Sequence, residues 1–129
     1  MNLIDYTDFV KSVTSEESEE VNALVERLYD LEISNGVNIS LLLTGAMGLS
    51  SEAGEFTEVV KKTIFQGKPL DLFHLKRELG DILWYWVNAV RAIGLTPEQV
   101  INENLNKIRK RYPQGFNIEH SENRVEGDL

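Results

Sequence analysis

The chain of 129 residues contains no cysteine. Disulfide bonds, thiolate-bound zinc and a cysteine nucleophile are therefore excluded, and this absence is compatible with the cytoplasmic location that we expect. Apolar runs are also short, and none approaches the roughly 20 residues that a membrane-spanning helix needs. The N-terminal segment MNLIDYTDF lacks the order of basic and apolar residues that is typical of a signal peptide.

Basic residues are scarce. Thirteen lysines and arginines stand against 21 aspartates and glutamates, which gives a formal net charge of −8. Proteins that bind nucleic-acid polymers neutralise phosphates with a basic face, so this chain is a poor candidate for that class. We expect neither a nucleic-acid polymer nor a membrane as partner. A polyanionic ligand requires a local basic cluster or a bridging cation.

Proline is also rare, with three residues at positions 69, 97 and 113, each at a plausible helix boundary. Helical periodicity dominates elsewhere, and no alternating strand pattern competes with it. The length suits one domain, over residues 1–117, followed by a polar, flexible tail over 118–129. We predict an all-α fold, an antiparallel bundle with a short N-terminal helix at about 3–13 and main helices at about 15–35, 38–66, 71–93 and 98–112.

Two acids lie beside the apolar stripe of the predicted helix 38–66. At about 100° per residue, Glu52 falls inside the apolar arc and Glu55 on its flank, whereas Glu58 points toward water. The predicted helix 71–93 repeats this arrangement, with Glu78 inside the stripe and Asp81 at its border. The intervening residues allow an antiparallel return that places the two acid pairs face to face.

Acids three residues apart ordinarily form a solvated helix face. Four carboxylates that converge on apolar surfaces must instead be protonated, pair with bases or hold a cation. Arg77 is the nearby basic residue on the predicted helix 71–93, and it is predicted to turn to the polar side. A bound cation is therefore favoured. Carboxylates without His or Cys suit Mg²⁺, with Mn²⁺ as a possible substitute. A di-iron site would show Glu-x-x-His pairs, which neither His74 nor His120 forms.

Two further patterns are ambiguous. Gly54 and Gly80 lie inside the acid pairs, which indicates close backbone approach, clearance for a ligand, or chance. Asn104, Lys107 and Arg111 share one face of the predicted helix 98–112. This basic face is either a ligand-binding surface or a solubilising helix end that the helix dipole favours.

Three segments, SSEAGEFTEVVKK, KRELGDILWYWVNAV and NLNKIRKRYPQGF, together resemble the MazG-like nucleoside triphosphate pyrophosphohydrolases of the all-α NTP pyrophosphatase superfamily. The resemblance covers about residues 38–117. Ser51 stands where many members of the family have an additional glutamate. The family motif, Glu-x-x-Glu, a variable spacer and Glu-x-x-Asp, is matched by Glu52, Glu55, Glu78 and Asp81.

The resemblance implies Mg²⁺-dependent hydrolysis of a nucleoside triphosphate between the α and β phosphates, with the four acids as metal ligands and catalytic residues. It also implies homodimers, in some members paired into tetramers. Lys107 and Arg111 match basic positions of the family's C-terminal helix and are expected to bind the triphosphate, with Lys61 as a further candidate. We expect Asn104 to meet the sugar or base, and Tyr85 to stack on or hydrogen-bond the nucleoside.

Several alternatives are compatible with the sequence. Trp84 falls on the polar side of its helix, where it forms a dimer contact, stacks on a base or is simply exposed, whereas Trp86 and Leu79 are predicted core residues. The rival functions are a catalytically inactive, metal-binding interaction module and a metal-free dimerisation bundle. The four acids together with Lys107 and Arg111 favour the enzyme, because a structural ion would not require the basic helix face.

Overall fold

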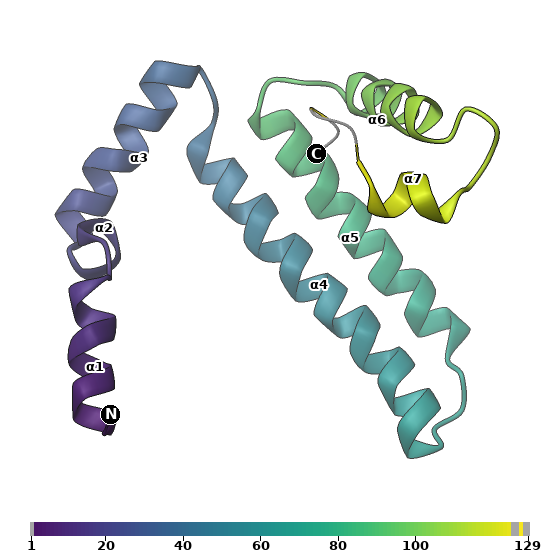
Figure 1. Cartoon of the computed structure of the whole chain (residues 1–129), viewed down its shortest axis with the longest axis horizontal. Helices are drawn as coiled ribbons and strands as arrows, with labels where there is room; N and C mark the ends of the chain where they lie inside the picture. The colour runs from purple at the N-terminus through teal and green to yellow at the C-terminus, as the bar shows by residue number, and fades with distance from the viewer. Residues whose placement is uncertain (1, 125–126, 128–129) are drawn as a thin grey trace.

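The computed structural model describes residues 2–124 and 127, and this part of the chain contains no β-strand. The expected all-α class, with four long helices and a short N-terminal one, is confirmed (Figure 1). None of the described helices combines the length and the apolar character that crossing a bilayer demands. The helices are α1 (Leu3–Ser12), α2 (Glu16–Glu19), α3 (Val21–Asn35), α4 (Ile39–Gln66), α5 (Leu72–Ala92), α6 (Pro97–Arg111) and α7 (Ile118–Glu122).

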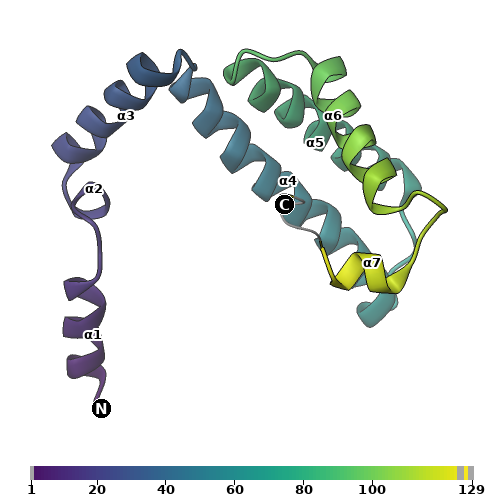
Figure 2. The ribbon, with the colours of Figure 1, turned by 45° about the horizontal axis from the view of Figure 1, so that its top comes forward.

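The centre of the fold is the antiparallel pair α4 and α5, which lie side by side in both views (Figures 1 and 2). Helix α4 begins after Asn38, whose side chain accepts a hydrogen bond of 2.9 Å from the backbone N–H of Leu41. It ends before Gly67, which adopts the left-handed conformation (φ 65°) that glycine reaches without strain. Asp71 caps α5 by accepting a hydrogen bond of 2.9 Å from the N–H of His74. Gly67 and Asp71 thus bound the turn between the two helices, where the predicted helices 38–66 and 71–93 leave a gap.

Two glycines of α4 allow α5 to approach closely. A Cβ on Gly48 would overlap the ring of Tyr85, and a Cβ on Gly45 would lie 2.8 Å from the Cβ of Ala89. By contrast, Gly54 and Gly80 have open space where a Cβ would stand, so close backbone approach is wrong for both. The helices therefore meet over Gly45 and Gly48, and the acid-bearing part of the pair has clearance.

The N-terminal third differs from the sequence prediction in one respect. A continuous helix over about 15–35 is wrong, because Glu20 has an extended backbone (φ −117°, ψ 115°) that separates α2 from α3. Glu16 lies three and four residues before Glu19 and Glu20, and like charges at these spacings oppose a helix. The predicted stop of α3 is confirmed at Gly36, which is left-handed (φ 65°).

One copy of the chain buries little apolar surface. Helix α3 meets the start of α4 and diverges from it along its length (Figures 1 and 2), and it contributes no buried residue. Among the described residues the buried hydrophobic side chains are Val90 and Ala92. Leu79 is 54% exposed, so its predicted core position is wrong for a single chain, whereas Trp86 is half-buried. The long helices present apolar faces that one copy does not cover.

The C-terminal part begins with α6, which Thr96 caps by a reciprocal hydrogen-bond pair with Gln99. The predicted flexible tail begins with the five-residue helix α7. Asn117 caps α7 by accepting a hydrogen bond of 3.2 Å from the N–H of His120. The prediction for residues 125–126 and 128–129 lies outside the described residues.

Candidate active site

Three carboxylates from two helices converge. Glu52 and Glu55 lie one turn apart on α4, and Glu78 comes from the neighbouring α5. One oxygen of each lies within 4.8 Å of the others. Glu78 is 6% exposed, Glu52 is half-buried and Glu55 is exposed. The predicted face-to-face arrangement of acids on the two helices therefore exists for these three residues.

Asp81 lies outside that group of three but borders the same space. It lines a hollow of about 500 Å³ together with the three glutamates. Arg77, which the sequence places on the polar side, is exposed and also lines this hollow. Its guanidinium lies 6.0 Å from the ring centroid of Phe73, and it forms no ion pair with the carboxylates of the described residues. The acids thus share one space in which the nearby arginine does not neutralise them through an ion pair.

The surroundings raise the pKa of Glu52 above its ordinary value of 4.5. Burial disfavours the charged form most, and the negative charges of Glu55, Asp81 and Glu78 add to this effect. On the same helix, Glu58 binds Lys61 and Lys62 at 3.0 and 3.1 Å, and these bonds lower its pKa. Glutamates that look alike in the sequence therefore have opposite electrostatic environments.

The two carboxylate oxygens of Glu78 differ in their contacts. His74 Nε2 lies 2.8 Å from Glu78 Oε1, one helical turn away on α5. The other oxygen, Oε2, is buried and has no hydrogen-bond partner in the part of the chain that the structure describes. A buried acceptor left unpaired is costly, and a bound cation would satisfy it. The donor set of carboxylate oxygens fits a hard divalent ion such as Mg²⁺.

His74 is not among the site residues that the sequence predicts. The available signal is its position four residues before Glu78, which places both side chains on one face of the helix. A metal ligand often needs a second group that orients it. His74 takes that position toward Glu78 without belonging to the group of three carboxylates.

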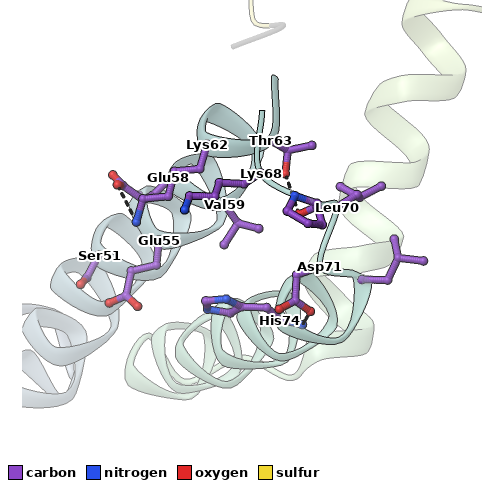
Figure 3. A pocket seen from close by; sticks show the side chains of 13 residues that line it. Ser51, Glu55, Glu58, Val59, Lys62, Thr63, Lys68, Leu70, Asp71 and His74 are labelled. Atoms are coloured by element: carbon purple, nitrogen blue, oxygen red, sulfur yellow. Dashed lines mark hydrogen bonds and ion pairs between the residues drawn. The ribbon is translucent and has the colours of Figure 1, made fainter. Parts of the chain in front are cut away.

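A second hollow of about 920 Å³ adjoins the acidic one at the turn between α4 and α5 (Figure 3). The two hollows share Glu55, Asp71 and His74 in their linings. Figure 3 shows Glu55 on one helix and His74 on the other at the border of this space. Lys62 and Lys68 also line the second hollow, so basic groups lie beside the carboxylates on the same hairpin.

The predicted nucleoside contact, Tyr85, lies elsewhere. Its ring packs where Gly48 provides room on α4, and it meets the ring of Trp84 edge-on with centroids 4.8 Å apart. Tyr85 lines neither the acidic hollow nor the one at the turn. Lys61 is held by Glu58 and is also absent from both linings. The structure therefore does not bring Tyr85 or Lys61 to the carboxylates.

The predicted basic face of α6 borders a different hollow. Asn104 and Lys107 line a space of about 590 Å³ beside Trp86. The guanidinium of Arg111 lies 6.0 Å from the ring centroid of Tyr112. Within one copy, Asn104 and Lys107 therefore line a space separate from that of the three carboxylates.

The fold is thus an all-α one in which two antiparallel helices share a group of three carboxylates that could hold a divalent cation. The chain belongs to the family of the MazG nucleotide pyrophosphohydrolase domain, whose model matches residues 42–116. The chain is also similar to the "Gene 37 protein" of Mycobacterium phage L5, with 33% identity over 73 residues. That match spans 54% of this chain and 64% of the phage protein, which is less than two thirds of its length. No solved structure matches the chain.

Proposed function

We propose that the protein hydrolyses ribo- or deoxyribonucleoside triphosphates between the α and β phosphates, releasing a monophosphate and pyrophosphate in a Mg²⁺-dependent reaction. The observation that carries this proposal is the convergence of Glu52, Glu55 and Glu78, together with a buried oxygen of Glu78 that has no hydrogen-bond partner among the described residues. Membership of the pyrophosphohydrolase family supports the type of reaction. We place this activity in the cytoplasm, on nucleotide pools.

The residues divide the work as follows. Glu52, Glu55 and Glu78 would hold Mg²⁺, which when bound neutralises phosphate charge and activates water. His74 keeps Glu78 oriented by its contact of 2.8 Å. Asp81 lies outside the group of three, and we assign to it the acceptance of the proton from the attacking water.

We further propose that the working form is a homodimer or a dimer of dimers. Leu79, Leu83 and Trp84 of α5 are 54%, 57% and 58% exposed, and buried hydrophobic residues are few in the described part of one copy. A chain of this size needs a larger buried apolar surface to offset the conformational entropy of folding. Trp84 is assigned to the contact between copies, since large exposed apolar patches mark such interfaces.

Association also offers a role for the basic face of α6. Asn104 and Lys107 line a hollow separate from the carboxylates of their own copy. We propose that these two residues and Arg111 reach the substrate at the site of a second copy, with Lys107 and Arg111 on the phosphates and Asn104 on the sugar or base. We assign structural roles to Tyr85 and Lys61, because Tyr85 packs between the helices and Lys61 pairs with Glu58.

The experiment that tests the proposed function is a panel of ribo- and deoxyribonucleoside triphosphates incubated with the purified chain and Mg²⁺. Monophosphate and pyrophosphate are the expected products, and chelation of Mg²⁺ stops their release. Orthophosphate and a diphosphate would show that a different bond is cleaved. Mg²⁺ binding without any product would instead identify the inactive metal-binding module.

A further inference from the structure

We propose that the hollow at the turn between α4 and α5 is a phosphate subsite, in which Lys68 binds the pyrophosphate end of the substrate. The proposal rests on the proposed function for the identity of the ligand. Lys68 is not among the substrate-binding residues that the sequence predicts, and it lies on the same helical hairpin as the carboxylates.

The backbone of the turn is fixed at the position of Lys68. Gly67 is left-handed, and the N–H of Lys68 donates a hydrogen bond of 3.2 Å to the carbonyl of Lys62. Pro69 follows, and its carbonyl accepts a hydrogen bond of 3.5 Å from Thr63 Oγ1 (Figure 3). Lys68 is therefore carried by an ordered turn, which lowers the entropic cost of binding a ligand there.

The charges around the hollow leave Lys68 available. Lys62, the other lysine in the lining, binds Glu58 at 3.1 Å. The side chain of Asp71 accepts the capping hydrogen bond from the N–H of His74. Lys68 forms no ion pair with any carboxylate among residues 2–124. An ammonium group in this situation favours an anionic ligand, and phosphate oxygens suit it.

The position of the hollow then sets the direction of the ligand. A phosphate group can lie beside the three carboxylates only when they hold a cation. The remaining phosphates of the substrate must extend away from carboxylates that no cation neutralises, because like charges repel. The hollow at the turn adjoins the acidic one through Glu55 and His74 and offers positive charge at Lys68. The terminal phosphates are therefore assigned to the turn, and the leaving pyrophosphate is held there by Lys68.

The test is calorimetric titration of the full chain with pyrophosphate, and separately with a nucleoside monophosphate, in saturating Mg²⁺. Lys68→Ala is expected to weaken pyrophosphate binding by about tenfold, since a hydrogen bond to a charged group is removed. Lys68→Arg retains most of the affinity, and monophosphate and Mg²⁺ binding stay unchanged in both variants. Lys76→Ala is the matched control, because Lys76 is exposed on α5 and lines neither hollow. Circular dichroism verifies that each variant keeps its helix content.

The failures of the two proposals are distinguishable. Lys68-dependent pyrophosphate binding in a chain that hydrolyses no triphosphate would support the subsite and reject the proposed function. If the unaltered chain hydrolyses triphosphates and Lys68→Ala binds pyrophosphate as tightly as the unaltered chain, the subsite alone is rejected. Absence of pyrophosphate binding in the unaltered chain, or loss of monophosphate affinity in place of pyrophosphate affinity, would also overturn the subsite.

Discussion

His74 Nε2 and Glu78 Oε1 lie 2.8 Å apart on successive turns of α5, and Glu78 is almost fully buried. The contact orients a carboxylate whose second oxygen, Oε2, is buried without a hydrogen-bond partner among the described residues. His74→Ala should therefore weaken Mg²⁺ binding by about 10- to 100-fold, the usual effect of losing a group that orients a metal ligand. Calorimetric titration with Mg²⁺ and no nucleotide measures this. His120→Ala, which changes the other histidine of the chain, is the control, and equal affinity of the two variants would remove His74 from this role.

Glu78 and Asp81 are expected to fail in different ways. Glu78→Gln removes a charge from the group of three, so both Mg²⁺ binding and turnover should be lost. Asp81→Asn should keep Mg²⁺ affinity within a few-fold and lower kcat by about 10²- to 10⁴-fold, the range for loss of a general base. Glu98→Gln, on the exposed first turn of α6, is the neutral comparison. Parallel loss of metal affinity in the Glu78 and Asp81 variants would show that Asp81 is a ligand.

The raised pKa of Glu52 predicts a dependence of stability on pH. Burial, and then the charges of Glu55, Asp81 and Glu78, make the folded chain hold this proton above pH 4.5. The contribution of Glu52 to stability is therefore fully present below pH 4.5 and is lost as pH rises through the raised pKa. Without metal, Glu52→Gln should have a higher melting temperature than the unaltered chain near pH 7 and a similar one near pH 4. Saturating Mg²⁺ should reverse the order at neutral pH.

Glu58→Gln is expected to change the pH dependence of stability in the opposite direction to Glu52→Gln, on the same helix. Because Lys61 and Lys62 lower the pKa of Glu58, its contribution to stability is present above pH 4.5 and is lost as pH falls through the lowered pKa. This variant should therefore be less stable than the unaltered chain near pH 7, with or without Mg²⁺. The same pH response in the Glu52 and Glu58 variants would contradict the difference in their surroundings.

The close contact between Gly48 and Tyr85 predicts a stability effect. Gly48→Ala places a Cβ into the ring of Tyr85 and should lower the free energy of unfolding by about 1–3 kcal/mol, as overpacking does. Gly80→Ala adds the same group in open space and should raise that free energy by up to about 1 kcal/mol, because alanine favours helix. Urea denaturation compares the two variants. A Gly48→Ala chain as stable as Gly80→Ala would show that the helices separate more readily than the structure indicates.

Complementation between copies tests whether the basic face of α6 acts across an interface. Glu78→Gln and Lys107→Ala should each be inactive, and coexpressing both should restore about a quarter of the activity, because half of the dimers are mixed and each mixed dimer has one intact site. Size-exclusion chromatography with light scattering establishes the number of copies. No recovery in mixed dimers would place Lys107 at the site of its own copy.

Local sequence signals predict the boundaries of the central hairpin well. Asn38, Gly67 and Asp71 act through hydrogen bonds and backbone conformations within a few residues, so no distant contact is needed to recognise them. The inward position of Glu52 and Glu78 also follows from helical periodicity. The break at Glu20 is harder to predict, because the favourable helix dipole competes with repulsion among neighbouring acids.

The remaining features depend on how the helices are rotated against each other. Four glycines of α4 and α5 invite close contact, and the structure uses Gly45 and Gly48 and leaves Gly54 and Gly80 clear. Tyr85 fills the space that Gly48 leaves, which removes it from the acidic hollow. These contacts depend on how side chains pack between α4 and α5, so no short stretch of sequence predicts them.

The central claim is that Glu52, Glu55 and Glu78 hold one divalent cation between α4 and α5. The most direct measurement is anomalous diffraction from crystals of the protein grown with Mn²⁺. The predicted result is a peak in contact with one carboxylate oxygen from each of these residues, including Oε2 of Glu78. A peak elsewhere on the protein, with none among these three side chains, would contradict the account.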